Sequence, residues 1–445
     1  MGEPQRDKLK VHSRKCVLVA VIDPRSGQNR ERAFDEMEGL VTTAGSEVVG
    51  KVMQVRDKPD AATYIGKGKV IELKELIGET EADLIAFDAD LSPSQGKKLE
   101  EATGTQVVDR SEVILDIFAT HARTYESKLQ VELAQLLYLR PRLTRMWSHL
   151  ERITGGIGSG KGPGEKQLET DRRLVDTRIA ELKRRLEEVV ERRDRQAASR
   201  TQHMTVSLVG YTNAGKSTLM NALTGADVYI ADKLFATLDT RTRVWNLNYF
   251  GDILLSDTVG FIRDLPHHLV ASFKSTLSEA RHADLLLHVV DCSHPDAFDH
   301  IKTVNEVLGD VGVDSEDPIL VLNKVDAAKD RAAIDVLRVK FPNSITVSAK
   351  EKTGLEKFQD AVCARLADGF LEARVEADAG NGKVYSFLAE HAEVTKTEYE
   401  ESNVIYECRI PKRFAYVLKQ EGATLKNMDG SPLKLVQEEE WSISG

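Results

Sequence analysis

Along the first 120 residues, short runs of β-branched apolar residues alternate with longer amphipathic stretches of mixed apolar and polar positions. Ser92 and Ser111 are suited to cap two of the amphipathic stretches as helices. Strands that alternate with helices are typical of a small parallel α/β domain, which we expect to span residues 1–125. The predicted strands are 16–22, 47–55, 84–88 and 106–108, and the predicted helices are 30–44, 67–77, 92–101 and 111–119.

Residues 126–200 carry the pattern of two long helices, at 126–139 and 167–195. Apolar positions in the second helix recur at alternating spacings of four and three, which leaves one narrow stripe along its length. A stripe of this kind requires a partner, and the preceding helix is the natural choice. Pro141 is expected to end that first helix. We therefore expect a helical hairpin arm, whose second helix contributes Val175, Ile179, Leu182, Leu186 and Val189.

Two further units follow the predicted arm. Hydrophobic runs that each end in a polar loop predict buried strands, and they indicate a larger α/β domain at residues 201–371. The last part of the chain, residues 372–445, has the pattern of a small α+β domain without a recognisable site. Its predicted strands are 404–410 and 433–436, and its predicted helices lie near 384–392 and 414–421.

The composition is that of an ordinary soluble protein, with 41% hydrophobic and 30% charged residues in a chain of 445. The N-terminus is polar and has no secretory signal, and the longest apolar run, 16–22, is too short to span a membrane. The four cysteines are scattered without metal-ligand spacing, which favours a reducing compartment. We therefore expect a cytoplasmic, monomeric protein.

The most specific chemical motif opens the predicted domain at 201–371. Gly210-Tyr-Thr-Asn-Ala-Gly215-Lys216-Ser217 lies between a predicted strand and a predicted helix, which is the context of a phosphate-binding loop. In such a loop the backbone amides face the phosphates, Lys216 reaches the β- and γ-phosphates, and the Ser217 hydroxyl ligates Mg²⁺. The expected nucleotide contacts in this segment are Gly210, Asn213, Ala214, Gly215, Lys216, Ser217 and Thr218.

Two downstream segments match the parts of a GTPase that sense the γ-phosphate. Asp257-Thr-Val-Gly260 follows a predicted strand; Asp257 is expected to hold the Mg²⁺ through water, and the Gly260 amide to bond the γ-phosphate. Thr237 is our candidate for the mobile hydroxyl that closes on the metal, with Thr240 as the alternative. The predicted metal ligands are thus Ser217, Thr237 and Asp257, and the predicted catalytic residues are Lys216, Thr237 and Gly260.

The nucleotide base is expected to be guanine. Asn323-Lys324-Val-Asp326 follows a predicted strand, and the Asp326 carboxylate can accept two N–H groups that guanine has and adenine lacks. Lys324 can lay its stem over the base. After a further strand, the loop Ser348-Ala349-Lys350 can offer an amide to the guanine O6. These motifs, in this order, predict a P-loop GTPase that uses GTP, GDP and Mg²⁺.

Phe261 departs from the usual GTPase pattern. Small GTPases often have a glutamine directly after Asp-x-x-Gly to orient the attacking water, and a phenylalanine cannot do so. The pocket either holds water by another group or leaves hydrolysis slow until a partner completes it. We favour the second interpretation.

A second glycine-rich segment, 155–161, fits the spacing of a phosphate loop, but Gly162 stands where a metal-binding hydroxyl is required. Residues 140–200 contain sixteen Lys and Arg against ten Asp and Glu, in a chain of net charge −10. Basic side chains, flat rings and bare glycine backbone suit irregular RNA, whereas the alternative is a flexible linker. The predicted RNA contacts are Arg142, Arg145, His149, Arg152, Lys161, Lys166, Arg172 and Arg173.

Together these motifs resemble the HflX family of ribosome-associated GTPases over nearly the whole chain. The resemblance rests on residues 64–69, 107–111, 129–134, the loop and helix at 155–173, and the segment 257–266 with its Phe261. It implies a factor that binds the large ribosomal subunit in its GTP form and splits stalled or idle ribosomes, notably under stress. The arm tip would then approach RNA near the peptidyl-transferase centre.

Two departures from the family are small: Lys161 replaces a usual Arg, and Asp239-Thr240 replaces a common Asp-Pro. The first weakens any bidentate phosphate contact at that position. Two other functions stay open, namely a GTPase that checks maturing large subunits and an RNA-binding scaffold that nucleotide only stabilises.

Overall fold

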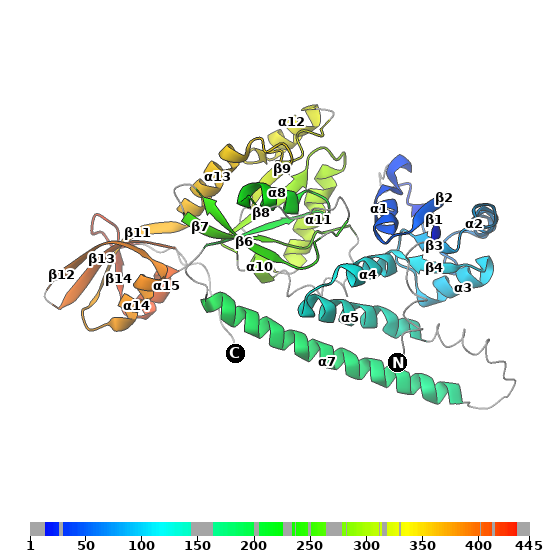
Figure 1. The fold of residues 1–445 in the computed structure, drawn as a ribbon, viewed down its shortest axis with the longest axis horizontal. Coiled ribbons are helices and arrows are strands. Elements are labelled where there is room, and N and C mark those ends of the chain that lie inside the picture. The colour runs from blue at the N-terminus through cyan, green and yellow to red at the C-terminus, as the bar shows by residue number, and fades with distance from the viewer. Residues whose placement is uncertain are drawn as a thin grey trace.

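The computed structural model describes residues 14–25, 30–143, 163–199, 204–225, 234–235, 237–247, 251–263, 278–281, 283–310, 312–313, 318–328, 331–400, 402–411 and 414–433. These residues form three sheets that follow one another along the chain (Figure 1). A long helix, α7 (Pro163–Ser199), runs beneath the first two sheets. No helix within the described ranges is long and apolar enough to cross a membrane.

The N-terminal sheet confirms the predicted parallel α/β fold. Its strand order is β2-β1-β3-β4, and all neighbours are parallel. The strands are β1 (Lys15–Ile22), β2 (Glu47–Val55), β3 (Leu84–Phe87) and β4 (Gln106–Asp109), and the helices are α1 (Asp35–Thr43), α2 (Lys67–Thr80), α3 (Pro93–Thr103) and α4 (Arg110–His121), with a 3-10 turn η3 (Arg30–Arg32) before α1.

The two predicted helix caps have different outcomes. Ser92 caps α3 with a complete capping box, in which its side chain and that of Gln95 satisfy each other's backbone amides. Ser111 is not a cap, and that prediction is wrong. Asp109 takes the role, because its carboxylate accepts from the Glu112 amide at 2.9 Å, and Ser111 is buried one residue inside the helix.

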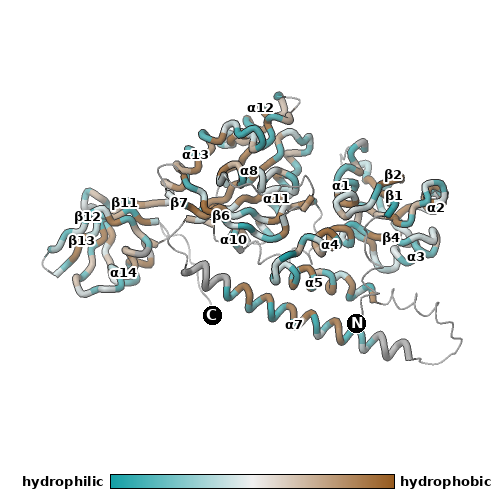
Figure 2. Tube along the Cα trace, viewed as in Figure 1, coloured by the Kyte–Doolittle hydropathy of each residue, from teal (hydrophilic) through white to brown (hydrophobic). Residues whose placement is uncertain are grey.

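The arm is a helical hairpin, as the apolar stripe predicted. Helix α5 (Tyr125–Leu139) ends in a short 3-10 turn, η4 (Arg140–Arg142), that contains Pro141. Leu129 and Leu133 of α5 pack against α7, whose side of the contact is Ile179, Leu182 and Leu186. Apolar positions recur along α7 between polar ones (Figure 2). Among the described side chains of α7, the charged ones between these apolar positions are exposed or half-buried.

The central sheet has the order β10-β9-β8-β5-β7-β6, parallel except for β6. The sequence prediction identified four of its strands and missed β6 and β8. The strands are β5 (Thr205–Gly210), β6 (Arg241–Leu247), β7 (Gly251–Asp257), β8 (Leu285–Asp291), β9 (Ile319–Asn323) and β10 (Ile345–Thr346), and the helices are α8 (Lys216–Thr224), α10 (Ser278–Arg281), α11 (Ala297–Asp310), α12 (Arg331–Lys340) and α13 (Leu355–Asp368).

The C-terminal sheet is antiparallel, with the order β12-β13-β11-β14. It confirms a small α+β unit, although residues 434–436 of one predicted strand lie outside the described part of the chain. The strands are β11 (Phe370–Asp378), β12 (Glu393–Glu400), β13 (Asn403–Pro411) and β14 (Thr424–Lys426), and the helices are α14 (Gly382–His391) and α15 (Ala415–Gln420).

One hydrophobic cluster joins the N-terminal and central units. Helices α1 and α4 contribute Met37, Leu40 and Phe118, and the central unit contributes Phe235 and Phe261 from loops near the phosphate-binding motif. The rings of Phe118 and Phe235 meet edge to face, with centroids 4.7 Å apart. The N-terminal unit is therefore packed directly against the loops that a GTPase moves.

Candidate nucleotide and magnesium site

The loop between β5 and α8 has the shape that phosphate binding requires. Gly215 has a φ of 91°, in the left-handed region, and a Cβ added there would collide with the Asn323 side chain. A Cβ at Gly210 would collide with the Val289 carbonyl. Both positions are therefore restricted to glycine by the close approach of neighbouring strands. Asn213, in between, also has a positive φ of 60°.

Lys216 lies inside this loop and is 6% exposed. Its ammonium donates to the carbonyls of Gly210 and Tyr211 at 3.0 Å each. Burial lowers the pKa of Lys216 to about 8, while the nearby Asp257 carboxylate acts in the opposite direction. A cation that is desolvated and only partly compensated favours an anionic ligand such as a phosphate.

The three predicted metal ligands meet at one point. The Ser217 hydroxyl donates to Asp257 Oδ2 at 2.6 Å and lies 2.8 Å from the Thr237 hydroxyl. The other carboxylate oxygen, Asp257 Oδ1, is buried and has no hydrogen-bond partner among the described residues. Burial raises the pKa of Asp257, and the Lys216 charge opposes that rise. Two hydroxyls beside a carboxylate oxygen without a partner fit Mg²⁺, which prefers oxygen ligands.

Gly260 approaches the phosphate loop closely. A Cβ at this position would lie 2.8 Å from Thr212 Cα and 3.0 Å from Lys216 Nζ. The next residue, Phe261, makes two backbone hydrogen bonds to the loop. Its carbonyl accepts from Thr212 N at 2.7 Å, and its amide donates to the Gly210 carbonyl at 3.1 Å. The Phe261 ring is 3% exposed and belongs to the cluster between the two units.

The residues predicted to select guanine are tied to the phosphate loop. Asn323 Nδ2 donates to the Ala214 carbonyl at 2.9 Å, and Asn323 Oδ1 accepts from the Ala349 amide at 3.0 Å. Asp326 Oδ1 accepts from the Ser348 hydroxyl at 2.6 Å, which orients the carboxylate. Lys324 pairs with Asp291 at 2.8 Å, whereas the Lys350 side chain is exposed. Thr218 lies in the first turn of α8.

Sequence reasoning missed a charged cluster between the N-terminal unit and the loop that follows Gly260. Glu36 of α1 accepts from the Tyr211 hydroxyl at 2.8 Å, and that hydroxyl accepts from the Arg263 amide at 2.8 Å. Arg263 also pairs with Asp88 at 2.8 Å. Arg110, with a side chain only 3% exposed, pairs with both Glu36 and Asp88. No local pattern marks these residues, because they are brought together only by the packing of the two units.

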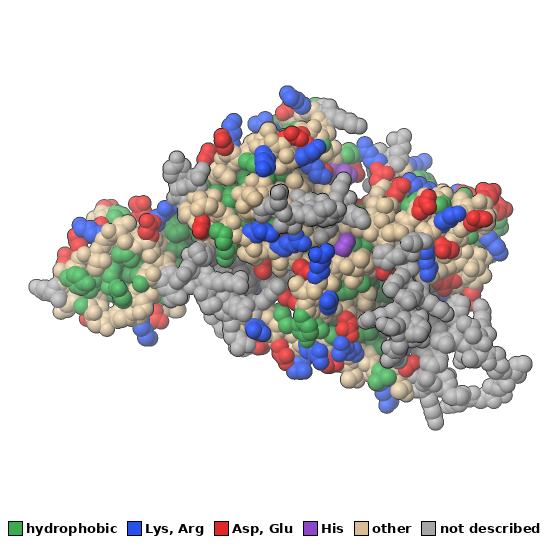
Figure 3. Space-filling model, viewed as in Figure 1, with side chains coloured by type: hydrophobic (Ala, Val, Ile, Leu, Met, Phe, Trp, Pro, Cys, Tyr) green, Lys and Arg blue, Asp and Glu red, His purple; other side chains and the backbone are tan. Residues whose placement is uncertain are grey.

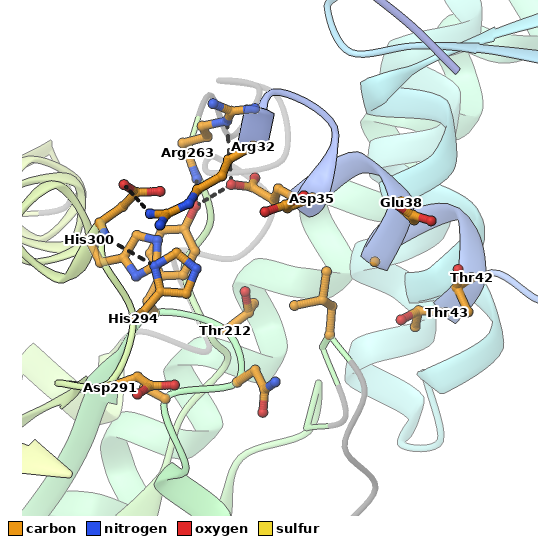
Figure 4. A pocket seen from close by; sticks show the side chains of 17 residues that line it. Arg32, Asp35, Glu38, Thr42, Thr43, Thr212, Arg263, Asp291, His294 and His300 are labelled. Carbon is orange, nitrogen blue, oxygen red and sulfur yellow. Dashed lines mark hydrogen bonds and ion pairs between the residues drawn. The ribbon is translucent and has the colours of Figure 1, made fainter. Parts of the chain in front are cut away.

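A cavity of about 650 Å³ lies beside this cluster. Figure 4 shows Asp35 and Glu38 of the N-terminal unit on one side and His294 and His300 of the central unit on the other. The Arg32 side chain reaches across from the N-terminal unit towards the two histidines and lies 3.8 Å from Asp296. The His300 ring stacks on Tyr211 at 3.8 Å between centroids. Burial lowers the pKa of His300 to about 4, so the ring is neutral at physiological pH.

Comparison with known proteins matches three family models. They are described as GTP-binding GTPase N-terminal, over residues 31–119; GTP-binding GTPase Middle Region, over 121–200; and 50S ribosome-binding GTPase, over 205–324. A GTPase HflX from Caldanaerobacter subterraneus subsp. tengcongensis is 43% identical over 409 residues, which cover 91% of each chain. The GTPase HflX of Escherichia coli is 44% identical over 382 residues, covering 85% of this chain and 89% of the relative.

This chain belongs to the HflX family of GTPases. It therefore binds GTP, hydrolyses it to GDP and phosphate, and uses Mg²⁺ as GTPases of this class do. Among solved structures, it is similar to SsGBP in complex with GDP, at 25% identity and a TM-score of 0.47, covering 79% of this chain and 98% of that chain.

The arm residues predicted to contact RNA are placed differently from one another in this HflX-family chain. Arg142 donates to Asp109 at 2.9 Å and to the Leu91 carbonyl at 2.7 Å, and it stacks on Tyr138, so its guanidinium is held against the N-terminal unit. Arg172 and Arg173 are exposed on α7. Arg145, His149, Arg152 and Lys161 lie outside the described residues, as does the side chain of Lys166.

The described surface of the arm is not uniformly basic. Arg173 pairs with Glu169 at 3.2 Å along α7, and Arg178 joins the two helices by pairing with Glu132 of α5 at 2.9 Å. Basic and acidic side chains are interspersed over this part of the molecule (Figure 3). The excess of positive charge in the sequence therefore belongs mainly to the segment that joins the two helices.

Proposed function

We propose that this HflX-family GTPase binds the large ribosomal subunit in its GTP form and splits stalled or idle ribosomes, notably under stress, as a cytoplasmic monomer. The observation that carries the proposal is the union of a GTP site with a hairpin arm whose connecting segment is rich in Arg, Lys and Gly. The match over residues 205–324 to a model described as a 50S ribosome-binding GTPase supports it. The arm tip would contact ribosomal RNA near the peptidyl-transferase centre.

The proposed catalytic roles follow from the geometry at the phosphate loop. The Lys216 ammonium stabilises the negative charge that develops on the phosphates, and the Gly260 amide holds the γ-phosphate. Ser217, Thr237 and Asp257 would hold Mg²⁺, which neutralises phosphate charge when bound. The proposed nucleotide contacts are Gly210, Asn213, Ala214, Gly215, Lys216, Ser217, Thr218, Asp257, Gly260, Asn323, Lys324, Asp326, Ser348, Ala349 and Lys350.

Hydrolysis by the isolated chain is proposed to be slow. Phe261 is buried and cannot orient water, so a group or a rearrangement supplied on the ribosome is needed for a fast reaction. Single-turnover hydrolysis with and without ribosomes should differ by at least about ten-fold, a modest effect beside the roughly 10³- to 10⁵-fold activation that a partner's arginine gives to other GTPases. Equal rates would contradict this part of the proposal.

Sedimentation of intact ribosomes on a sucrose gradient tests the proposal as a whole. The chain with a non-hydrolysable GTP analogue should convert ribosomes to subunits, and the chain with GDP should not. Binding only to precursor particles would support the alternative, a GTPase that checks maturing large subunits. Ribosome binding that does not depend on the nucleotide would support the scaffold alternative. The geometry of Lys216 and Asp257 is evidence against that alternative.

The guanine assignment can be tested separately with Asp326→Asn. An amide in place of the carboxylate cannot accept both guanine N–H groups, so GTP affinity should fall by about ten- to a hundred-fold, the value of one bidentate contact to a base, while affinity for xanthosine triphosphate rises. Fluorescent nucleotide titration measures both. Unchanged GTP affinity would refute the role of Asp326.

The arm assignment can be tested with Arg145, Arg152 and Lys161 replaced together by alanine. Loss of three cations should weaken ribosome binding and make its salt dependence shallower, because fewer counterions are released. GTP affinity is the control and should stay unchanged. If GTP binding is lost instead, the segment has a structural role.

A further inference from the structure

The loop that carries Thr237 is fixed at two points a short distance apart. At the first point, the Thr237 hydroxyl lies 2.8 Å from the Ser217 hydroxyl at the proposed metal site. Two residues later, the Asp239 carboxylate accepts three hydrogen bonds from residues that precede α5. These come from the amides of Arg123 and Thr124 at 3.2 and 3.3 Å, and from the Thr124 hydroxyl at 2.6 Å.

Thr124 is the N-cap of α5, the first helix of the arm. Its hydroxyl also accepts from the Ser127 amide at 3.1 Å, so the same side chain begins the helix and holds Asp239. A carboxylate at this position is further stabilised by the partial positive charge of a helix N-terminus. The contact joins residues 115 positions apart in the chain.

The residues around Asp239 leave the loop little freedom. Leu238 and Phe235 are each 2% exposed within the cluster that the N-terminal and central units share. Three consecutive residues span at most about 7 Å between the first and last Cα. Thr237 therefore cannot leave Ser217 by a large distance unless Leu238 leaves the core or Asp239 releases α5.

Helix α5 connects this contact to the rest of the arm. It packs along α7 through Leu129 and Leu133, and Glu132 holds Arg178 of α7 at 2.9 Å. In GTPases the hydroxyl that meets the metal is released after hydrolysis. Release of Thr237 would pull on Leu238 and Asp239, and through Asp239 on the first turn of α5.

We infer that Asp239 is a positioning residue for GTP hydrolysis: by holding the first turn of α5 it keeps Thr237 beside Ser217, and it couples the nucleotide site to the base of the arm. This inference rests on the proposed role of Thr237. Coupling of this kind is reciprocal, so a partner that fixes the arm increases the preference for GTP by the same factor as GTP stabilises the arm.

The test uses the full-length chain without ribosomes, in the variants Asp239→Ala, Asp239→Asn and Thr124→Val. We expect Asp239→Ala to lower affinity for a GTP analogue about five-fold, the value of a lost helix cap, while GDP affinity stays unchanged. Asp239→Asn, which keeps one acceptor oxygen, should lie between. Adding Thr124→Val to Asp239→Ala should cause no further loss of affinity for the GTP analogue, because the Thr124 hydroxyl reaches the nucleotide site only through Asp239. Thr124→Val also removes the N-cap of α5, so it should lower stability in either background.

A matched control is Thr80→Val, which removes a hydroxyl at the end of α2 that donates within its own helix, at 2.7 Å to the Leu76 carbonyl. It should behave as the wild type. Hydrogen exchange provides a readout independent of hydrolysis: peptides that contain the Arg123 and Thr124 amides should be better protected with the GTP analogue than with GDP, and the difference should vanish in Asp239→Ala.

If Asp239→Ala lowers the melting temperature and leaves the GTP-to-GDP preference unchanged, Asp239 is a structural cap and the inference is overturned. Equal protection of those amides in both nucleotides would overturn it as well. Thr237→Ala separates the two levels. If it leaves the preference unchanged, the proposed role of Thr237 fails; if it lowers the preference and Asp239→Ala does not, only the coupling fails.

Discussion

Phe261 packs in the core at a position where other GTPases have the glutamine that orients the attacking water. Its ring is 3% exposed in the cluster that joins α1 and α4 to the central unit, while its backbone pairs with Gly210 and Thr212 of the phosphate loop. The position is therefore an anchor for the segment after Gly260. The sequence predicts that water is not oriented here, but the anchoring becomes visible only when the two units are placed together.

Introducing the glutamine that other GTPases have at this position should therefore not speed up hydrolysis. Phe261→Gln places an amide in an apolar cluster, and we expect a loss of about 3 kcal/mol of stability with no rise in the intrinsic rate. Phe261→Leu keeps an apolar side chain, should cost about 1 kcal/mol, and should hydrolyse GTP at the wild-type rate. Urea unfolding and single-turnover assays measure both. A ten-fold faster rate in Phe261→Gln would contradict this interpretation of the site.

His288, in the middle of β8, gives the chain an acid-sensitive point. It is 1% exposed, and its Nε2 has no hydrogen-bond partner among the described residues. Burial lowers its pKa from 6.5 to about 3, helped by the nearby Lys216 charge. Below pH 6.5 the unfolded chain binds a proton that the folded chain excludes, so stability falls as pH decreases towards 3.

Replacing His288 with leucine should reduce that pH dependence. The change in stability per pH unit between 6 and 4 should become smaller by up to about 1.4 kcal/mol, whatever the constant cost or gain from packing. Urea unfolding followed by tryptophan fluorescence, to which the fully buried Trp245 of the same sheet contributes, reports the slope. An unchanged slope would mean that His288 is protonated in the folded protein.

Helices and strands were predictable where a hydrophobic pattern determines the structure by itself. The arm is an example, because the stripe on α7 has one possible partner and the two helices pack as the spacing predicts. Caps and edges were less predictable. Asp109, not Ser111, caps α4, because Asp109 ends β4 and its carboxylate lies within reach of the Glu112 amide in the first turn of the helix. Strand β12 is exposed along most of its length, so it has no apolar face that a sequence pattern could reveal.

The arm should be held by a few buried leucines. Leu182→Ala removes a fully buried side chain of α7 and should lower the stability of the hairpin by about 2–5 kcal/mol. Leu174→Ala on the same helix is the control: this side chain is 57% exposed, and its loss should change stability by no more than about 0.5 kcal/mol. Limited proteolysis of α7 compares the two.

GTP affinity should stay at the wild-type value in both arm variants, because the nucleotide contacts lie in the central unit. Equal protease resistance of Leu182→Ala and Leu174→Ala would mean that the packing between α5 and α7 does not stabilise the arm.

At the scale of the whole molecule, the two loops beside the nucleotide site, one with Asp239 and one with Arg263, are both bonded to units that precede them in the chain. Asp239 and Phe235 contact the start of α5 and the ring of Phe118, whereas Arg263 enters a cluster with Glu36 and Asp88. The phosphate loop and the guanine motif could be identified from sequence because each is local. These contacts could not, because each joins residues more than one hundred positions apart.

The nucleotide dependence of binding to purified large ribosomal subunits tests the central claim most directly. If the GTP state sets the position of the arm, the chain should bind large subunits at least about ten-fold more tightly with a non-hydrolysable GTP analogue than with GDP, a coupling of ordinary size between two sites. Equal affinity with the two nucleotides, at one fixed salt concentration, would contradict the account.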